Sequence, residues 1–295
     1  MPLSVRGVIP PVTTPFKADG SLDYEALGRN LTKWRTTGLA GYLILGSTGE
    51  FLTLSADERR TMLEVARAHI PREQIMIAGA GAESTPQAIQ YVKEAVRAGA
   101  DAVMVVNPNY YKPLLTAEAL YRHYVAVAEA SEVPVFLYNV PQFTGLNMDA
   151  ALVSRLAAHP NIVGIKDSSG NIPQLAEIIR NAPADFLVFP GSAQVVLPAL
   201  ALGAAGAILQ ISCFVPELCV RLVKEWDAGN IEAARKTNNL LLAMHEAIGK
   251  YGVPASKAAM DLRGYYGGPA RPPLLPPSPE QVAGFRAALE AAGQL

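Results

Sequence analysis

The stretch RAGADAVMVVN, residues 97–107, contains a pattern from which the fold can be predicted. It begins as the end of a helix, continues with Gly99 at the position where helices commonly terminate, and becomes an apolar strand. The same layout recurs in TTGLAGYLILG, residues 36–46, and in ALGAAGAILQI, residues 201–211. Each copy resembles the second half of a strand–helix–strand unit, so the sequence predicts an α/β protein.

Further apolar runs of strand length raise the predicted number of strands to eight. The strands are continuously apolar, which indicates a parallel sheet that is covered on both faces. Their spacing of roughly 20 to 35 residues, with a helix after each strand, favours a closed (β/α)8 TIM barrel over an open sheet. The additional runs are residues 8–12, 75–79, 133–138, 162–166 and 186–189.

The strand pattern ends at about Trp226, and the rest of the chain is typical of helices. Residues 230–252 and 278–293 are helical segments, and the second opens with a serine followed by a proline. Between them lies the connector GYYGGPARPPLLPPSP, residues 264–279, which is rich in glycine and proline. We therefore predict a barrel domain over residues 1–225 and a C-terminal α-helical domain over residues 226–295.

Composition excludes several classes of function. Of 295 residues, 50% are hydrophobic and 17% charged, which supports a large core. The net charge of −1 offers no attraction to nucleic acid. The cysteines, Cys213 and Cys219, stand in apolar surroundings and are expected to be buried reduced thiols. The stretch MPLSVRGVIPPVTTPF lacks the features of a targeting signal, so we expect a cytoplasmic protein.

The segment from Ser192 to Val215 is free of charge and long enough to cross a membrane. Pro198 and Gly203 interrupt it, and a buried helix followed by a buried strand has the same appearance. We therefore predict a buried barrel segment and no association with a membrane.

In a (β/α)8 barrel, reacting groups stand at the carboxyl ends of the strands. The residues that close the predicted strands are therefore the candidates for chemistry, and they are expected to converge on one mouth. They are Ser47 with Thr48, residues 107–111, Tyr138, Lys166, and Gly191 with Ser192.

Lys166 ends an apolar run in NIVGIKDSSG, residues 161–170. Burying an unpaired ammonium is costly, so desolvation favours the neutral amine, which is a nucleophile. Such an amine forms an imine with a ketone, and the protonated imine withdraws electrons from the neighbouring carbon–carbon bond. The alternative is a structural lysine paired with a carboxylate on a neighbouring strand. Asp167 is not the obvious partner, because it points the opposite way on its strand.

Tyr138 and Thr48 have two interpretations each. The phenol of Tyr138 is placed to relay protons during imine formation, or it belongs to a core aromatic whose hydroxyl bonds the backbone. Thr48 lies in GSTGE, residues 46–50, where glycines allow backbone N–H groups to face a ligand carboxylate. The alternative for this stretch is a tight turn between a strand and a helix.

No cofactor or metal is expected from the sequence. The histidines fall in or beside helical segments, and no His/Glu pair with ligand spacing stands at a strand end. A GxGxxG or Walker pattern and a G-x-S-x-G elbow are also missing from the sequence. The histidines are His69, His123, His159 and His245.

Together, GSTGE (46–50), YNVP (138–141) and GIKDSSG (164–170) resemble the dihydrodipicolinate synthase and N-acetylneuraminate lyase family of pyruvate-handling class I aldolases. The resemblance extends over essentially the whole chain. It implies a TIM barrel with a C-terminal helical domain, and a homotetramer built as a dimer of dimers.

The resemblance also implies roles for single residues. Lys166 corresponds to the lysine that holds pyruvate as a Schiff base, and Tyr138 to the proton shuttle. Ser47 and Thr48 correspond to residues that contact the pyruvate carboxylate.

Two further roles follow from the same resemblance. Tyr111 corresponds to a tyrosine that crosses the dimer interface to complete a hydroxyl relay in the neighbouring subunit. Ile208 stands where the family makes a backbone contact with pyruvate.

The second substrate is predicted from departures within the family. Synthases carry an arginine two residues beyond YNVP, where this chain has Phe143, and a phenyl ring cannot replace a bidentate guanidinium. Ser168 after the lysine and the stretch RGYYGGPARPPL, residues 263–274, are similar to the 4-hydroxy-2-oxoglutarate aldolases. Thr48, by contrast, is more similar to the synthases.

We therefore favour cleavage of 4-hydroxy-2-oxoglutarate to pyruvate and glyoxylate. The alternative is 4-hydroxy-tetrahydrodipicolinate synthesis from pyruvate and aspartate semialdehyde, and a neuraminate lyase is a third option. A protein of a different class, which binds a 2-oxo acid without turnover, is the remaining hypothesis.

Overall fold

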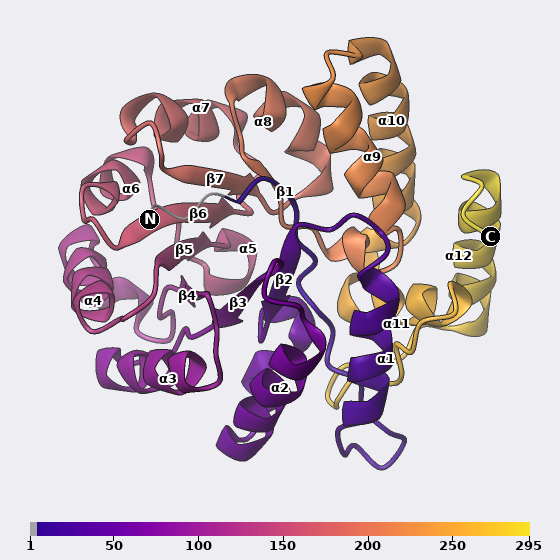
Figure 1. Cartoon of the computed structure of the whole chain (residues 1–295), viewed down its shortest axis with the longest axis horizontal. Coiled ribbons are helices and arrows are strands. Elements are labelled where there is room, and N and C mark those ends of the chain that lie inside the picture. The colour runs from indigo at the N-terminus through magenta and orange to yellow at the C-terminus, as the bar shows by residue number, and fades with distance from the viewer. Residues whose placement is uncertain (1–4) are drawn as a thin grey trace.

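Parallel strands form the centre of the molecule and helices surround them (Figure 1). The computed structural model describes residues 5–295, and the first four residues of the predicted barrel domain lie outside this range. All eight predicted strands are present. They are β1 (Gly7–Val8), β2 (Gly41–Ile44), β3 (Ile75–Gly79), β4 (Ala102–Val106), β5 (Val135–Asn139), β6 (Ile162–Asp167), β7 (Leu187–Pro190) and β8 (Gly206–Ala207).

The strands close into a barrel. β2 to β7 pair in sequential order as a parallel sheet, and β1 pairs with β8 in parallel. At one junction, Leu43 N–H donates to the Pro10 carbonyl over 3.0 Å. At the other, Ala205 N–H donates to the Val188 carbonyl over 2.9 Å. These bonds join the segment after β1 to β2 and the residue before β8 to β7, so the barrel is closed and the predicted (β/α)8 fold is confirmed.

The first strand is shorter than predicted. The sequence indicates a strand over residues 8–12, whereas β1 ends at Val8. Pro10 and Pro11 lack the N–H groups that a continuous ladder requires. The chain nevertheless stays extended beside β2, because Val12 N–H donates to the Leu43 carbonyl over 2.8 Å.

Most helices of the barrel lie between consecutive strands and cover its outside (Figure 1). The α-helices of this part are α1 (Tyr24–Trp34), α2 (Ala56–His69), α3 (Thr85–Arg97), α4 (Ala117–Glu129), α5 (Pro141–Thr144), α6 (Ala150–Ala157), α7 (Ile172–Asn181) and α8 (Val196–Leu202). Short 3-10 turns are η1 (Ser47–Gly49), η2 (Phe51–Thr53), η3 (Lys112–Leu114), η4 (Ala193–Val195), η5 (Gln210–Cys213) and η6 (Gly249–Tyr251).

The uncharged segment from Ser192 to Val215 folds into the barrel as η4, α8, β8 and η5. Across residues 5–295, none of the helices has both the length and the apolar character needed to cross a membrane.

The C-terminal part is helical and lies at one side of the barrel (Figure 1). Its helices are α9 (Pro216–Asp227), α10 (Ile231–Ala247), α11 (Gly252–Leu262) and α12 (Pro279–Ala291). The predicted boundary between residues 225 and 226 falls inside α9, which is continuous there. The division into two domains stays a prediction.

Apolar side chains fill the barrel interior. Phe136 and Phe189 meet edge to face at its centre, with ring centroids 6.2 Å apart, and Ile208 is fully buried in the same cluster.

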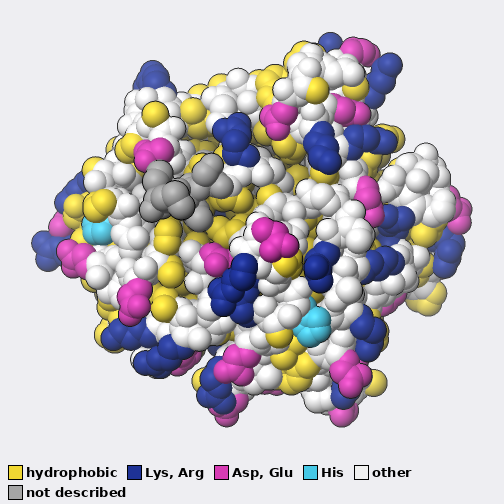
Figure 2. Space-filling view, in the orientation of Figure 1, with side chains coloured by type: hydrophobic (Ala, Val, Ile, Leu, Met, Phe, Trp, Pro, Cys, Tyr) yellow, Lys and Arg dark blue, Asp and Glu magenta, His cyan; other side chains and the backbone are white. Residues whose placement is uncertain are grey.

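Cys213 and Cys219 are buried free thiols, and burial raises the pKa of Cys213 to about 12. On the molecular face drawn in Figure 2, acidic and basic side chains are interspersed.

His123 in α4 gives a prediction about stability and pH. It is buried, its Nδ1 lies 2.9 Å from the Thr85 hydroxyl, and burial lowers its pKa to about 4. Between pH 6.5 and 4 the unfolded histidine takes up a proton that the folded one does not, so stability falls as pH falls. We expect His123 to account for about 2 kcal/mol of the loss between pH 7 and 5.

Urea denaturation at both pH values, compared between the natural protein and His123→Asn, measures this share. The variant should lose less free energy of unfolding on acidification. Equal losses in the two proteins would show that His123 does not couple folding to pH.

Candidate active site

Lys166 and Tyr138 lie side by side at the carboxyl ends of neighbouring strands. They are register partners on β6 and β5. The Lys166 Nζ atom stands 4.2 Å from the centroid of the Tyr138 ring. Both residues are buried, with 4% and 6% of their surfaces exposed. The structure thus brings together Lys166, the predicted nucleophile, and Tyr138, the predicted proton shuttle.

Lys166 is not paired with an acid in the part of the chain that the structure describes. Among residues 5–295, its amino group makes none of the ion pairs that the structure contains. Asp167 lies on the opposite side of β6, where its carboxylate accepts hydrogen bonds from Asn139 Nδ2 (2.8 Å) and Gln174 Nε2 (3.1 Å). The structural alternative for Lys166, a lysine neutralised by a carboxylate, is therefore not observed.

Gly191, directly after β7, leaves room for the lysine. A Cβ atom at this position would lie 2.0 Å from Ser168 Oγ and 3.1 Å from Lys166 Cε. Ser168 is itself buried, and its N–H donates to the Asn139 carbonyl over 2.8 Å. Ser168 and Lys166 thus share a space that any larger residue at position 191 would fill.

The loop after β2 holds Ser47 and Thr48 in a constrained turn. Thr48 is buried within η1, and Ser47 is partly buried. On either side of this turn, Leu45 and Glu50 adopt left-handed backbone conformations with φ of 62° and 54°. Such conformations cost about 1–3 kcal/mol each in residues with a side chain, and they cluster at functional sites. The turn is thus held in position by its surroundings.

A narrow pocket connects this loop to the barrel strands. Ser47, Met104 and Tyr138 are among the residues that line it. A larger hollow, lined by Ile162 and Phe186, lies at the opposite ends of β6 and β7. Of these two, the narrow pocket adjoins Ser47 and Tyr138, which the sequence selected for chemistry.

Two other candidate residues from the sequence, Tyr111 and Ile208, differ from each other in their exposure to solvent. Tyr111 is 64% exposed, beside the more exposed Tyr110, and does not join the buried group. Ile208 follows β8 and is fully buried, and its N–H donates to the Pro190 carbonyl over 3.1 Å.

The described residues, 5–295, contain no cluster of three or more histidine, cysteine or acidic side chains that could hold a metal ion.

Sequence reasoning missed a second buried lysine. Lys257 in α11 is fully buried and forms an ion pair of 2.7 Å with Glu50, the last residue of GSTGE. Its signal in the sequence, a lone lysine among small apolar residues in ASKAAM, is the same kind of signal that identified Lys166.

The fold and the lysine-bearing strand end define a (β/α)8-barrel enzyme of the lyase class, an aldolase. The chain belongs to the dihydrodipicolinate synthetase family, whose model matches residues 4–292. It is 40% identical over 280 residues to the 4-hydroxy-tetrahydrodipicolinate synthase of Archaeoglobus fulgidus, covering 94% of each chain.

Solved structures agree with this membership. The dihydrodipicolinate synthase of Thermotoga maritima superposes with a TM-score of 0.94 at 33% identity, covering 99% of this chain and 100% of the other. A prophage protein of the same family from E. coli, solved in complex with pyruvate, gives a TM-score of 0.91 at 32% identity, covering 98% and 99%. The predicted family is confirmed. The comparisons do not support the narrower assignment to the 4-hydroxy-2-oxoglutarate aldolases.

Gly191→Ala tests whether the space around Lys166 matters for its reactivity. The added methyl group would displace Ser168 and the end of Lys166, and a displacement of this size should slow reaction of the amine about tenfold or more. The measurement is the rate at which a small 2-oxo acid and borohydride modify residue 166, followed by mass spectrometry.

Gly284→Ala is the matched control, because a Cβ atom at this position in α12 meets nothing within 4 Å. It should react at the natural rate. If Gly191→Ala also reacted at that rate, the close packing at position 191 would have no bearing on the amine.

Proposed function

We propose that Lys166 forms a Schiff base with pyruvate and that the enzyme condenses this pyruvate with aspartate semialdehyde to give 4-hydroxy-tetrahydrodipicolinate. The observation that carries the first half is the buried Lys166 side chain, whose nitrogen lies against the Tyr138 ring and makes no ion pair within residues 5–295. The names of the curated relatives support the second half.

In the proposed reaction, the Lys166 amine attacks the ketone carbon of pyruvate, and loss of water gives an iminium ion. The iminium withdraws electrons, so the methyl group at C3 loses a proton and an enamine forms. C3 of the enamine then attacks the aldehyde carbon of the second substrate. The amino group of that substrate displaces Lys166 from the imine carbon, which closes the ring and frees the enzyme.

Other residues assist these steps in the proposal. The Tyr138 hydroxyl moves protons to and from the carbinolamine oxygen, because the phenol adjoins both Lys166 and the pocket. Ser47 and Thr48 hold the pyruvate carboxylate with hydroxyl and backbone N–H groups. Ser168 and the backbone of Ile208 complete the walls of this site. The reaction as proposed uses no metal or cofactor.

A second candidate function is cleavage of 4-hydroxy-2-oxoglutarate to pyruvate and glyoxylate. The observation that favours it is Phe143, which is 72% exposed in α5 where the synthases of this family carry an arginine. An exposed phenyl ring supplies neither charge nor hydrogen bonds to the carboxylate of aspartate semialdehyde. Turnover of both substrates by one preparation separates the two candidates.

Assembly and location complete the proposal. We infer a cytoplasmic homotetramer, a dimer of dimers, in which Tyr111 of one subunit completes the hydroxyl relay of its neighbour. The exposure of Tyr110, Tyr111 and Leu114 beyond β4 supports an interface there. Sedimentation velocity measures the assembly, and Tyr111→Phe tested beside Tyr110→Phe measures the relay.

Trapping with pyruvate and borohydride tests the Schiff base. The natural enzyme should acquire one reduced adduct at residue 166, located by peptide mass spectrometry, and Lys166→Ala should have neither adduct nor turnover. Tyr138→Phe should form the adduct about a hundredfold more slowly without unfolding, since a positioned proton donor contributes that much. An adduct on another lysine, or full turnover by Lys166→Ala, would refute the mechanism.

Phe143→Arg tests the choice of second substrate. A guanidinium at this position should raise kcat/KM for aspartate semialdehyde by about ten- to a hundredfold, because charge-assisted hydrogen bonds contribute about 1.5–3 kcal/mol. Phe143→Leu, which changes the side chain without adding charge, should show no gain. If Phe143→Arg left the kcat/KM unchanged, position 143 would not select the acceptor.

A further inference from the structure

A buried ion pair outside the pocket joins the C-terminal part of the chain to the loop after β2. Glu50 Oε1 and Lys257 Nζ are 2.7 Å apart, and their side chains are 2% and 1% exposed. Lys257 Nζ also donates to the Pro269 carbonyl over 2.7 Å and lies 4.5 Å from the centroid of the Phe16 ring. Because both charges are shielded from water, each depends on the other.

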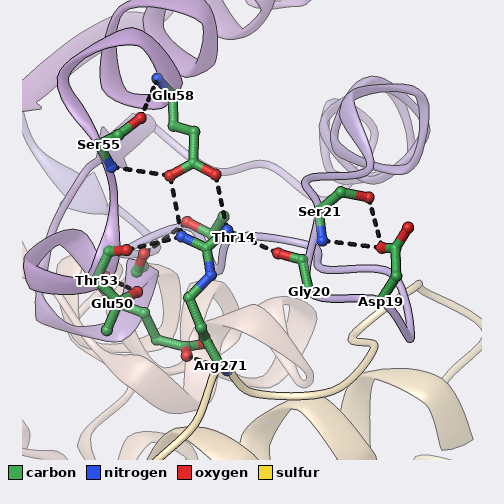
Figure 3. Close-up of polar contacts among 10 residues, drawn as sticks. Thr14, Asp19, Gly20, Ser21, Glu50, Thr53, Ser55, Glu58 and Arg271 are labelled. Atoms are coloured by element: carbon green, nitrogen blue, oxygen red, sulfur yellow. Dashed lines mark hydrogen bonds and ion pairs between the residues drawn. The ribbon is translucent and has the colours of Figure 1, made fainter.

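Arg271 reinforces this contact from the connector between α11 and α12. Its backbone N–H donates to the second carboxylate oxygen of Glu50 over 2.8 Å. Its guanidinium binds both carboxylate oxygens of Glu58, at 2.9 and 2.7 Å, and donates to the Thr53 carbonyl at 2.7 Å. A further bond reaches the Gly20 carbonyl (Figure 3). One side chain therefore holds the second half of the loop and the start of α2.

The clamped loop is the one that bears Ser47 and Thr48. The Glu50 N–H donates to the Ser47 carbonyl over 3.0 Å, which closes the η1 turn. At the same time Glu50 is held in a left-handed conformation that is unfavourable for a residue with a side chain. Such a conformation persists only while its surroundings fix it. Here Lys257 and the Arg271 backbone bind the Glu50 carboxylate, and the Thr53 hydroxyl donates to the Glu50 carbonyl over 2.8 Å.

We propose that Lys257 and Arg271 are positioning residues of the active site, which act through Glu50 and the loop to hold Ser47 and Thr48 against the carboxylate of pyruvate. The inference rests on the proposed role of Ser47 and Thr48 in pyruvate binding. It assigns a task to the C-terminal part of the chain, which touches the loop from outside the pocket. The affinity for pyruvate then depends on residues far along the chain from Lys166.

Arg271→Gln is the main test, because Arg271 is partly exposed and its loss leaves the buried pair in place. The carboxylate contacts are present in both the ground state and the transition state, so a misplaced loop should raise KM more than it lowers kcat. We expect KM for pyruvate to rise about tenfold, with kcat within about threefold of the natural value. Arg271→Lys, which keeps the charge, should restore part of the affinity.

Arg263→Gln is the matched control. Arg263 also joins C-terminal elements, through the Phe214 carbonyl at 3.0 Å, the Glu217 carboxylate at 3.0 Å and the Gln294 carbonyl, but these contacts lie away from the loop. It should lower the midpoint of denaturation and leave KM for pyruvate unchanged. If Arg271→Gln behaved like Arg263→Gln, the clamp would be purely structural and the inference wrong.

The buried pair provides a second measurement. Lys257→Met alone leaves the Glu50 charge unpaired and is expected to fold poorly, whereas Glu50→Gln with Lys257→Met removes both charges. The double variant should fold and show the raised KM. A natural KM in this variant would overturn the role of the pair. In all variants borohydride should still trap pyruvate at Lys166. If the natural enzyme itself formed no adduct, the proposed function would be wrong, and this outcome is distinct from a failure of the clamp.

Discussion

The site depends on one constraint, the burial of a lysine amine that makes no ion pair within residues 5–295. A buried charge without a partner is so unfavourable that its surroundings must be arranged around it. The β-strand provides the arrangement: Lys166 points toward the Tyr138 ring, while Asp167, one residue on, turns to Asn139 and Gln174. Gly191 then keeps the space beside the amine open. Alternation along a single strand therefore separates the acid from the amine.

A comparison of the two buried lysines shows how pairing with a carboxylate affects the role of a buried lysine. Lys166 and Lys257 are each a lone lysine within an apolar segment, and each lies beside an aromatic ring. Within residues 5–295, Lys257 meets a carboxylate and Lys166 does not, so the charge of Lys257 is balanced by its partner, and its proposed role is to position the loop. The same sequence signal therefore has two physical meanings. The tertiary structure chooses between them by what it brings near each nitrogen.

The same comparison explains how far the sequence could lead. The strands were predictable because continuous apolar runs are a local signal, and β1 was overestimated because its prolines lie in an apolar run yet cannot extend the ladder. Lys166 and Tyr138 could be placed because both close strands of a barrel. The contacts of Glu50 with Lys257 and Arg271 join residues 207 and 221 positions apart, and no spacing rule relates them. Gly191 was selected only by its place after a strand, and its steric reason required the structure.

The two halves of the proposed reaction rest on different parts of the molecule. Capture of pyruvate would use buried residues on barrel strands, and the family shares this framework over nearly the whole chain. Recognition of the second substrate would involve the mouth, where Phe143 is exposed on a four-residue helix and little packing restricts its identity. A side chain in that position can change charge without disturbing the barrel. Relatives at about 40% identity can therefore share the chemistry of the lysine and still differ in the partner that the captured pyruvate meets.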